Sequence, residues 1–211
     1  MTAVIIGLWS AAACAQDISA IRKMAESGDA AAQFEYGGYY EGRSDKARDH
    51  RRAVEWYSKA AEQGNALAQF NLGRMYLLGK GIEQDADLGV EWQLRAAEQG
   101  LAEAQYVVGK RYLFGGGVDK DSERALELII ASAEQGWADA QNQLGQIYFQ
   151  GAAVAKDVVR SYMWFSIAEQ NGDSTGQRFI AVLEEVMDKA QVEQAKTLVR
   201  EWQEAHAAGQ P

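Results

Sequence analysis

A glycine recurs every 36 residues along this chain, and that period limits the folds that the chain can form. The five copies are Gly28, Gly64, Gly100, Gly136 and Gly172. Nine residues after each copy stands a small residue, and five residues after each copy stands a glutamine: Gln33, Gln69, Gln105, Gln141 and Gln177. A fixed period of about 20 to 50 residues predicts a solenoid, in which each unit buries its apolar face only by stacking on the next.

The composition favours helices and opposes a nucleic-acid partner. The only proline among the 211 residues is Pro211, so no helix interior is interrupted by a missing N–H group. Acidic residues outnumber basic ones by 30 to 21, which gives a net charge of -9. Because nucleic-acid binding depends on a basic surface, we expect no nucleic-acid partner.

Each repeat contains two helical patterns around a glycine-containing loop. In the second repeat, Leu72, Gly73 and Tyr76 lie on the buried face of the first helix. Glycine costs about 1 kcal/mol relative to alanine inside a helix, so Gly73 predicts the close approach of a neighbouring helix. Gly79 is expected to end this helix in a left-handed C-cap, and Asp85 to cap the second helix. The recurrent glutamines share the buried face, where we expect them to hydrogen-bond between turns or repeats.

The recurring positions resemble the Sel-one-like repeat, a short relative of the tetratricopeptide repeat. The second repeat carries the pattern at Ala68-Gln69, Leu72-Gly73, Tyr76, Gly79, Gly81-Ile82, Asp85, Gly89, Trp92, Ala96-Ala97 and Gln99-Gly100. The resemblance implies an all-α fold, a right-handed superhelical α-solenoid of antiparallel helix pairs. It also implies an adaptor or scaffold, often exported from bacteria, but no particular partner.

The period divides the chain into repeats and end segments. A lone helical pattern precedes the first repeat, and two follow the last. We therefore expect a capping helix at 16–28, four repeats at 29–64, 65–100, 101–136 and 137–172, and a capping helix pair at 173–211.

The N-terminal segment has the composition of an export signal. Residues 1–13 carry no charged side chain, and Ala13-Cys14-Ala15 forms an A-x-A cleavage site. The sequence therefore predicts a signal peptide at 1–15, a periplasmic or secreted protein, and no transmembrane segment in the mature chain. One alternative is a cytoplasmic protein with a misassigned start, because the segment lacks Lys and Arg. Another is a lipoprotein anchored through Cys14.

A separate face of the first helices is the candidate surface for a protein or peptide partner. By resemblance to tetratricopeptide arrays, this face lines a concave groove. It combines aromatic, cationic and aliphatic side chains in the second and third repeats, and a tryptophan begins the fourth repeat. Aromatic and arginine side chains are common interface anchors. The candidate partner-binding residues are Phe70, Arg74, Leu77, Tyr106, Lys110, Leu113 and Trp137.

Two alternatives bear on these candidates. The two cations, Arg74 and Lys110, would favour an acidic segment or a C-terminal carboxylate as the ligand. The structural alternative is that the candidate side chains only pack between neighbouring first helices. The alternative for Trp137 is that its side chain fills a gap between repeats.

The first repeat departs from the loop pattern at 42–53, where five basic residues accompany two acidic ones. We expect a solvated variable loop there, with an acidic partner or lipid headgroups as the alternative.

The sequence favours a scaffold over an enzyme. Residues 172–176 match the G-x-S-x-G pattern around Ser174, but a nucleophile elbow also needs a strand and a nearby histidine. The two histidines, His50 and His206, lie near opposite ends of the chain, and Asp173 is expected to cap a helix instead. Relatives linked to β-lactam binding or hydrolysis carry paired cysteines in each repeat, which this chain lacks. We expect no enzyme, cofactor or metal; the alternatives are a β-lactam enzyme and a structural subunit of an envelope assembly.

Overall fold

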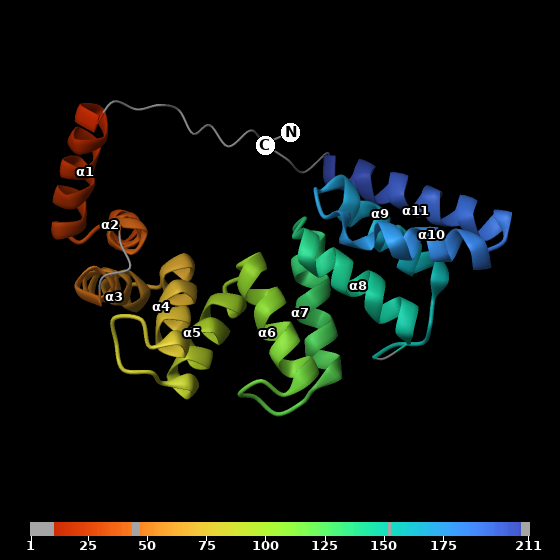
Figure 1. The fold of residues 1–211 in the computed structure, drawn as a ribbon, viewed down its shortest axis with the longest axis horizontal. Coiled ribbons are helices and arrows are strands. Elements are labelled where there is room, and N and C mark those ends of the chain that lie inside the picture. Colours follow the sequence, from red (N-terminus) through yellow and green to blue (C-terminus); the bar gives the residue numbers. More distant parts are fainter. Residues whose placement is uncertain (1–10, 44–46, 152, 208–211) are drawn as a thin grey trace. The chain divides into compact units, whose positions relative to one another are not determined.

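Helices form all of the regular structure in the part of the chain that the structure describes. In the computed structural model this part comprises residues 11–43, 47–151 and 153–207, and it holds eleven α-helices and one short 3-10 helix, η1 (Figure 1). No strand occurs within these ranges. The predicted all-α class is therefore confirmed.

The chain divides into two compact units, Met1–Ala96 and Ala97–Pro211. The first unit holds α1 (Ala11–Glu26), α2 (Ala30–Arg43), α3 (Ala47–Glu62), α4 (Ala66–Leu78) and most of α5 (Ala86–Glu98). The second unit holds α6 (Ala102–Phe114), α7 (Ser122–Glu134), α8 (Ala138–Gln150), α9 (Val158–Gln170), η1 (Ser174–Gly176), α10 (Gln177–Val186) and α11 (Lys189–Ala207).

Consecutive helices pack against each other inside each unit. In the first unit α2 packs on both α1 and α3, and α3 packs on α4. In the second unit α6 packs on α7, α7 on α8, and α8 on α9. Helices α10 and α11 both pack against α9. The second unit has its core around Leu144, Ile147 and Trp164. Each unit thus buries its apolar residues by stacking neighbours, as expected of a solenoid.

The two helices of a repeat cross at a pair of small residues. A Cβ atom on Gly73 would lie 2.6 Å from the carbonyl oxygen of Gly89, and Ser161 Oγ donates to the carbonyl oxygen of Gly145 at 2.8 Å. The expected close approach at Gly73 is confirmed. The partner position was not predicted from the sequence. It lies 16 residues later and is also small in the other two repeats, at Ala53 and Ala125.

The glycine that sets the 36-residue period is required by its backbone conformation. Gly64 has a φ of 89°, and a Cβ atom there would meet nothing within 4 Å. The left-handed region, and not lack of space, therefore excludes other residues. Gly79 ends α4 in the same left-handed region, as predicted.

The recurrent glutamines connect each repeat to its neighbour, which confirms their predicted structural role. Their Nε2 atoms donate to the carbonyl oxygen eight residues earlier, in the preceding second helix: Gln33 to Ala25, Gln69 to Ala61 and Gln141 to Ala133. Their Oε1 atoms accept from an amide 30 residues later: Gln63 to Gln33, Gln135 to Gln105 and Asn171 to Gln141. At Gln33, Gln69 and Gln141 the motif glutamine is thus a buried hydrogen-bonding link. Gln105 is only half-buried, and the expectation of a buried face is wrong for Gln177, which is exposed and donates to the Glu169 carboxylate.

The second helices begin with the aspartate caps that the sequence predicted. Asp121 Oδ1 accepts from the Arg124 backbone N–H at 2.9 Å, and Asp85 and Asp157 make the equivalent bonds. We expect Asp121→Ala to lower the free energy of unfolding by about 1 kcal/mol, because a free N–H of α7 loses its acceptor. Urea denaturation measures this loss. Asp119→Ala, in the exposed loop before the helix, is the matched control and should change stability by less than half as much.

The basic segment 42–53 is mostly helical, so the predicted loop is wrong. Helix α2 continues to Arg43 and α3 begins at Ala47, while residues 44–46 lie outside the described ranges. Arginine, lysine and alanine are good helix formers. His50 is buried, and a Cβ atom on Gly81 would lie 2.3 Å from its backbone carbon. The loop after α4 therefore packs directly on the start of α3.

The predicted signal peptide falls mainly on residues 1–10, which lie outside the described ranges. Helix α1 begins at Ala11, inside that predicted segment. The side chain of Cys14 is also not among the parts that the structure describes. Among the described residues, no helix has both the length and the apolar character needed to cross a bilayer.

Candidate functional site

The first unit contains three candidate residues, all on α4, and one of them is buried. Phe70 is only 6% exposed, so the expectation that its ring lies outside the buried face is wrong. Helix α4 is apolar on several faces, and such a helix is buried on more than one side. Arg74 is exposed and Leu77 is half-buried. Arg74 is therefore the residue of this set that can best reach a partner.

Arg74 already has an anionic partner within the first unit. Its Nη2 donates to Glu41 Oε1 at 2.6 Å, and the buried Tyr57 hydroxyl donates to Glu41 Oε2 at 2.8 Å. Burial, together with the hydrogen bond to Glu41 and its charge, raises the pKa of Tyr57. An acidic ligand would have to compete with Glu41 for Arg74. Because the ion pair is partly exposed, we expect it to be worth about 1 kcal/mol or less.

The second unit contains the other four candidates, three of them on α6. Lys110 Nζ lies 5.1 Å from the centre of the Tyr106 ring, in a cation–π contact. Tyr106 and Leu113 are half-buried and pack against the core of this unit. These contacts support the packing alternative for Tyr106 and Leu113. Lys110 is partly exposed and has no carboxylate partner among the described residues.

Trp137 is the fourth candidate of the second unit and lies at the N-cap of α8. Its side chain makes no capping hydrogen bond and packs, half-buried, against the core of the unit. This packing supports the gap-filling alternative. The buried Nε1–H nevertheless has no partner, and Trp137 also lines a hollow of about 360 Å³. The hollow lies at the turn before α8 and the turn before η1.

The segment that matches the G-x-S-x-G pattern forms a helix start. Ser174 begins η1, and Asp173 accepts from the Thr175 backbone N–H at 2.8 Å and from Asn142 Nδ2 at 2.7 Å. The predicted cap at Asp173 is confirmed. Burial alone would raise the pKa of Asp173, but the hydrogen bonds from Thr175 and Asn142 outweigh it and lower the pKa. No strand precedes Ser174 within the described ranges.

His206 makes its contacts with Trp202, one turn earlier in α11. The His206 ring stacks on Trp202 with centroids 3.9 Å apart, and its Nδ1 lies 2.7 Å from the Trp202 carbonyl oxygen. The described residues hold no group of three or more His, Cys, Asp or Glu side chains placed to bind a metal ion.

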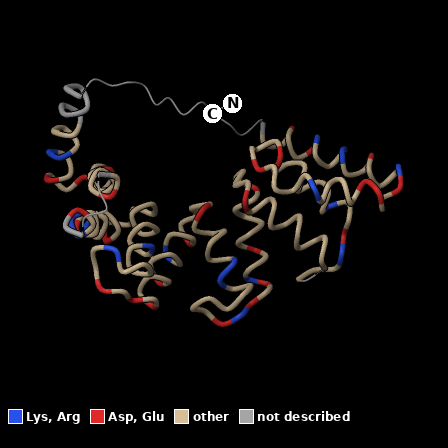
Figure 2. The backbone as a smooth tube through the Cα atoms, viewed as in Figure 1, with Lys and Arg blue, Asp and Glu red and all other residues tan. Residues whose placement is uncertain are grey.

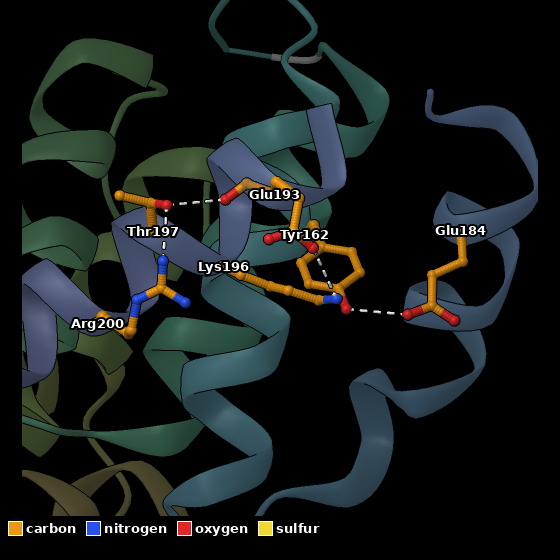
Figure 3. Close-up of polar contacts among 6 residues, drawn as sticks. All are labelled: Tyr162, Glu184, Glu193, Lys196, Thr197 and Arg200. Carbon is orange, nitrogen blue, oxygen red and sulfur yellow. Dashed lines mark hydrogen bonds and ion pairs between the residues drawn. The ribbon is translucent and has the colours of Figure 1, made fainter. Parts of the chain in front are cut away.

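A second hollow, which the sequence analysis missed, lies between α10 and α11. Its volume is about 380 Å³, and its lining consists of Glu184, Met187, Lys189, Val192, Glu193 and Lys196. Figure 3 shows that Tyr162 of α9 donates to Glu184, at 2.9 Å, and that Lys196 pairs with Glu193 at 3.2 Å. Burial and Glu184 raise the pKa of Tyr162 to about 12. Since these charges largely neutralise one another, the hollow favours no single ligand charge.

The charged residues are interspersed over the described part of the chain. Figure 2 shows short segments with Lys or Arg and others with Asp or Glu scattered among uncharged residues in both units. Many form ion pairs within one helix, such as Arg95 with Glu91 and Arg124 with Glu127.

A model of the Sel1 repeat matches the chain four times in succession. The matches cover residues 30–65, 66–101, 102–137 and 138–173. The chain belongs to the Sel1 repeat family. Each match begins one residue after the start predicted from the glycine period. Sel1 repeat proteins generally act as protein-interaction scaffolds, and their fold is not normally catalytic.

Two solved Sel1 repeat structures share the fold of this chain. A protective antigen present in uropathogenic Escherichia coli strains, which displays an SLR fold, is 35% identical over 94% of this chain, with a TM-score of 0.81. A Sel1 repeat protein from Oxalobacter formigenes is 32% identical over 80% of this chain, with a TM-score of 0.73. These likenesses confirm the predicted α-solenoid. The chain covers 43% and 49% of those proteins, and no curated protein matches it.

Proposed function

We propose that this Sel1 repeat protein is an adaptor that binds a peptide or protein segment on the first-helix faces of its repeats. The observation that carries the proposal is Lys110 on α6, which is partly exposed, lies over Tyr106 and has no carboxylate partner among the described residues. A cation held on an aromatic ring is a preorganised anchor, because little side-chain freedom is lost on binding.

The chemistry of Lys110 favours an acidic partner segment or a C-terminal carboxylate. Arg74 on α4 contributes less, since Glu41 already neutralises it. We therefore rank Lys110 above Arg74 as a determinant of binding. A purely structural subunit would instead form a complex of fixed stoichiometry, and co-purification from the native host separates these two cases.

Export from the cell is part of the same proposal. The uncharged residues 1–13 and the cleavage pattern at Ala13-Cys14-Ala15 support a periplasmic or secreted protein. The Escherichia coli relative is a protective antigen, which is also in keeping with an exported protein. Fractionation of the native host, followed by N-terminal sequencing of the mature chain, tests this location.

Charge reversal on the first-helix faces tests the binding proposal. We expect the double variant Arg74→Glu/Lys110→Glu to lose its co-purifying partner, with a drop in affinity of about tenfold or more, because two attractive contacts become repulsive. Far-UV circular dichroism should stay unchanged. The partner captured by the wild-type chain is quantified in a pull-down.

The matched control reverses two arginines of second helices, as Arg95→Glu/Arg124→Glu. These side chains are 49% and 50% exposed and ion-paired, which resembles Arg74 at 46%. The control should keep the partner. Retained binding by the first-helix variant, or equal loss by both variants, would contradict the proposed face.

A further inference from the structure

The hollow beside Trp137 is a second candidate site, formed by the turns before α8 and η1. The features that matter are the indole of Trp137, the carboxylates of Asp139 and Asp173, and the amide of Asn171. The backbones of Gly136 and Gly172, both at positive φ, complete the rim. All of these residues belong to the second unit, and most lie in the turns between repeats.

Trp137 lacks a helix cap and also leaves a buried donor unpaired. The equivalent residues Asp29 and Asn65 cap their helices, by accepting from backbone N–H groups at 2.7 Å and 2.9 Å, whereas the equivalent Leu101 makes no such bond. Trp137 provides no such bond, so α8 forgoes a stabilising cap. The indole also leaves its Nε1–H buried without an acceptor. Since buried donors are normally paired, this residue is costly for the fold by itself.

Two aspartates, Asp139 and Asp173, line the hollow together with Trp137. Asn142 Nδ2 donates a hydrogen bond to Asp173 Oδ2, and this bond fixes the orientation of the Asn142 side-chain amide. Asn142 is only 5% exposed, and its Oδ1 has no partner. Asp139 is exposed and forms no ion pair within the described ranges. Asp139 therefore brings a carboxylate without a described partner to the hollow, and Asp173 adds a second negative charge that already accepts from Thr175 and Asn142.

We infer that this hollow receives a basic side chain, arginine by preference, from a partner protein. A planar guanidinium stacks on an indole face and donates several hydrogen bonds to carboxylates at once. The net charge of -9 draws basic segments toward the chain. An anionic ligand is disfavoured, because Asp139 and Asp173 would repel it.

The test uses the full chain with Nα-acetyl-L-arginine amide as the probe. The indole N–H resonance of Trp137 is assigned by its absence from the spectrum of Trp137→Asn, and its chemical shift is followed during titration. We expect a saturable shift with the arginine probe and one at least about tenfold weaker with the citrulline counterpart, which has the same shape but no charge. Added salt should weaken the binding. No shift, or an equal shift with citrulline, overturns the inference.

Two variants distinguish a loss of probe binding at the hollow from a loss of folding. Trp137→Asn introduces the capping residue found at Asn65, so the thermal stability of this variant should be unchanged or higher. The resonances of Asn142 and Asn171 should no longer respond to the probe. Asp139→Asn should weaken binding about tenfold or more, whereas Glu134→Gln, an exposed charge of α7 that does not line the hollow, should not. Unchanged binding in Trp137→Asn or Asp139→Asn overturns the inference.

This inference is independent of the first-helix faces. The variant Lys110→Glu should bind the arginine probe as the wild-type chain does, because Lys110 does not line the hollow. Loss of the co-purifying partner in that variant, combined with intact probe binding, assigns the two activities to two sites.

Discussion

Replacing Gln141 by alanine is expected to lower the free energy of unfolding by about 2–4 kcal/mol. Gln141 is fully buried; it donates to the Ala133 carbonyl oxygen and accepts from Asn171 Nδ2, both at 2.9 Å. Each lost hydrogen bond costs about 1 kcal/mol, and the cavity left by the missing side-chain atoms adds to the loss. Because the bond to Ala133 joins the third repeat to the fourth, and the bond from Asn171 holds the Gln141 side chain within the fourth, their removal weakens the stacking of repeats.

The matched control for this prediction is Gln143→Ala in the same helix. Gln143 is partly exposed and has no hydrogen bond among the described contacts, so alanine should change the stability by less than about 0.5 kcal/mol. Urea denaturation followed by circular dichroism measures both variants. A loss of less than 1 kcal/mol in Gln141→Ala would show that the motif glutamine is not a major link between repeats.

The glutamine series shows how far a sequence period can predict structure. The period places Gln141 on the buried face, and its polarity then requires a partner. The identity of that partner does not follow, since Asn171 lies 30 residues away, beyond the next helix. The helix ends were predictable because capping is local in sequence. Gly79 and Asp121 end or begin a helix through bonds with backbone groups only a few residues away.

The candidate binding residues were harder to predict, because exposure depends on every neighbouring helix. A helical wheel finds the face of α4 that its own partner helix covers, yet it misses the packing that also buries Phe70. The ion pair between Arg74 and Glu41 spans 33 residues and connects two repeats. Trp137 differs from these, because its departure from the repeat is visible in the sequence. Only the unpaired Nε1–H and the adjoining hollow needed the structure.

Replacing Gly73 by alanine should destabilise the chain by about 1–2 kcal/mol. Alanine is the better helix former by about 1 kcal/mol, so any net loss must come from packing. The new Cβ atom would lie 2.6 Å from the Gly89 carbonyl oxygen and 3.2 Å from the Gln93 backbone nitrogen. Backbone atoms cannot rotate away as a side chain can, so α4 and α5 must separate, and overpacking of this kind typically costs about 1–3 kcal/mol.

A glycine-to-alanine substitution at Gly38, beside the equivalent Gly37 in the first repeat, should have the opposite sign. A Cβ atom on Gly38, within α2, would meet only the Tyr57 hydroxyl at 3.6 Å, which is an ordinary contact. Gly38→Ala should therefore raise the free energy of unfolding by up to about 1 kcal/mol. Both variants are compared with the wild-type chain by urea denaturation. If Gly73→Ala were stabilising too, helix propensity alone would account for both results, and the small-residue crossing of the two helices would not explain why glycine recurs at this position.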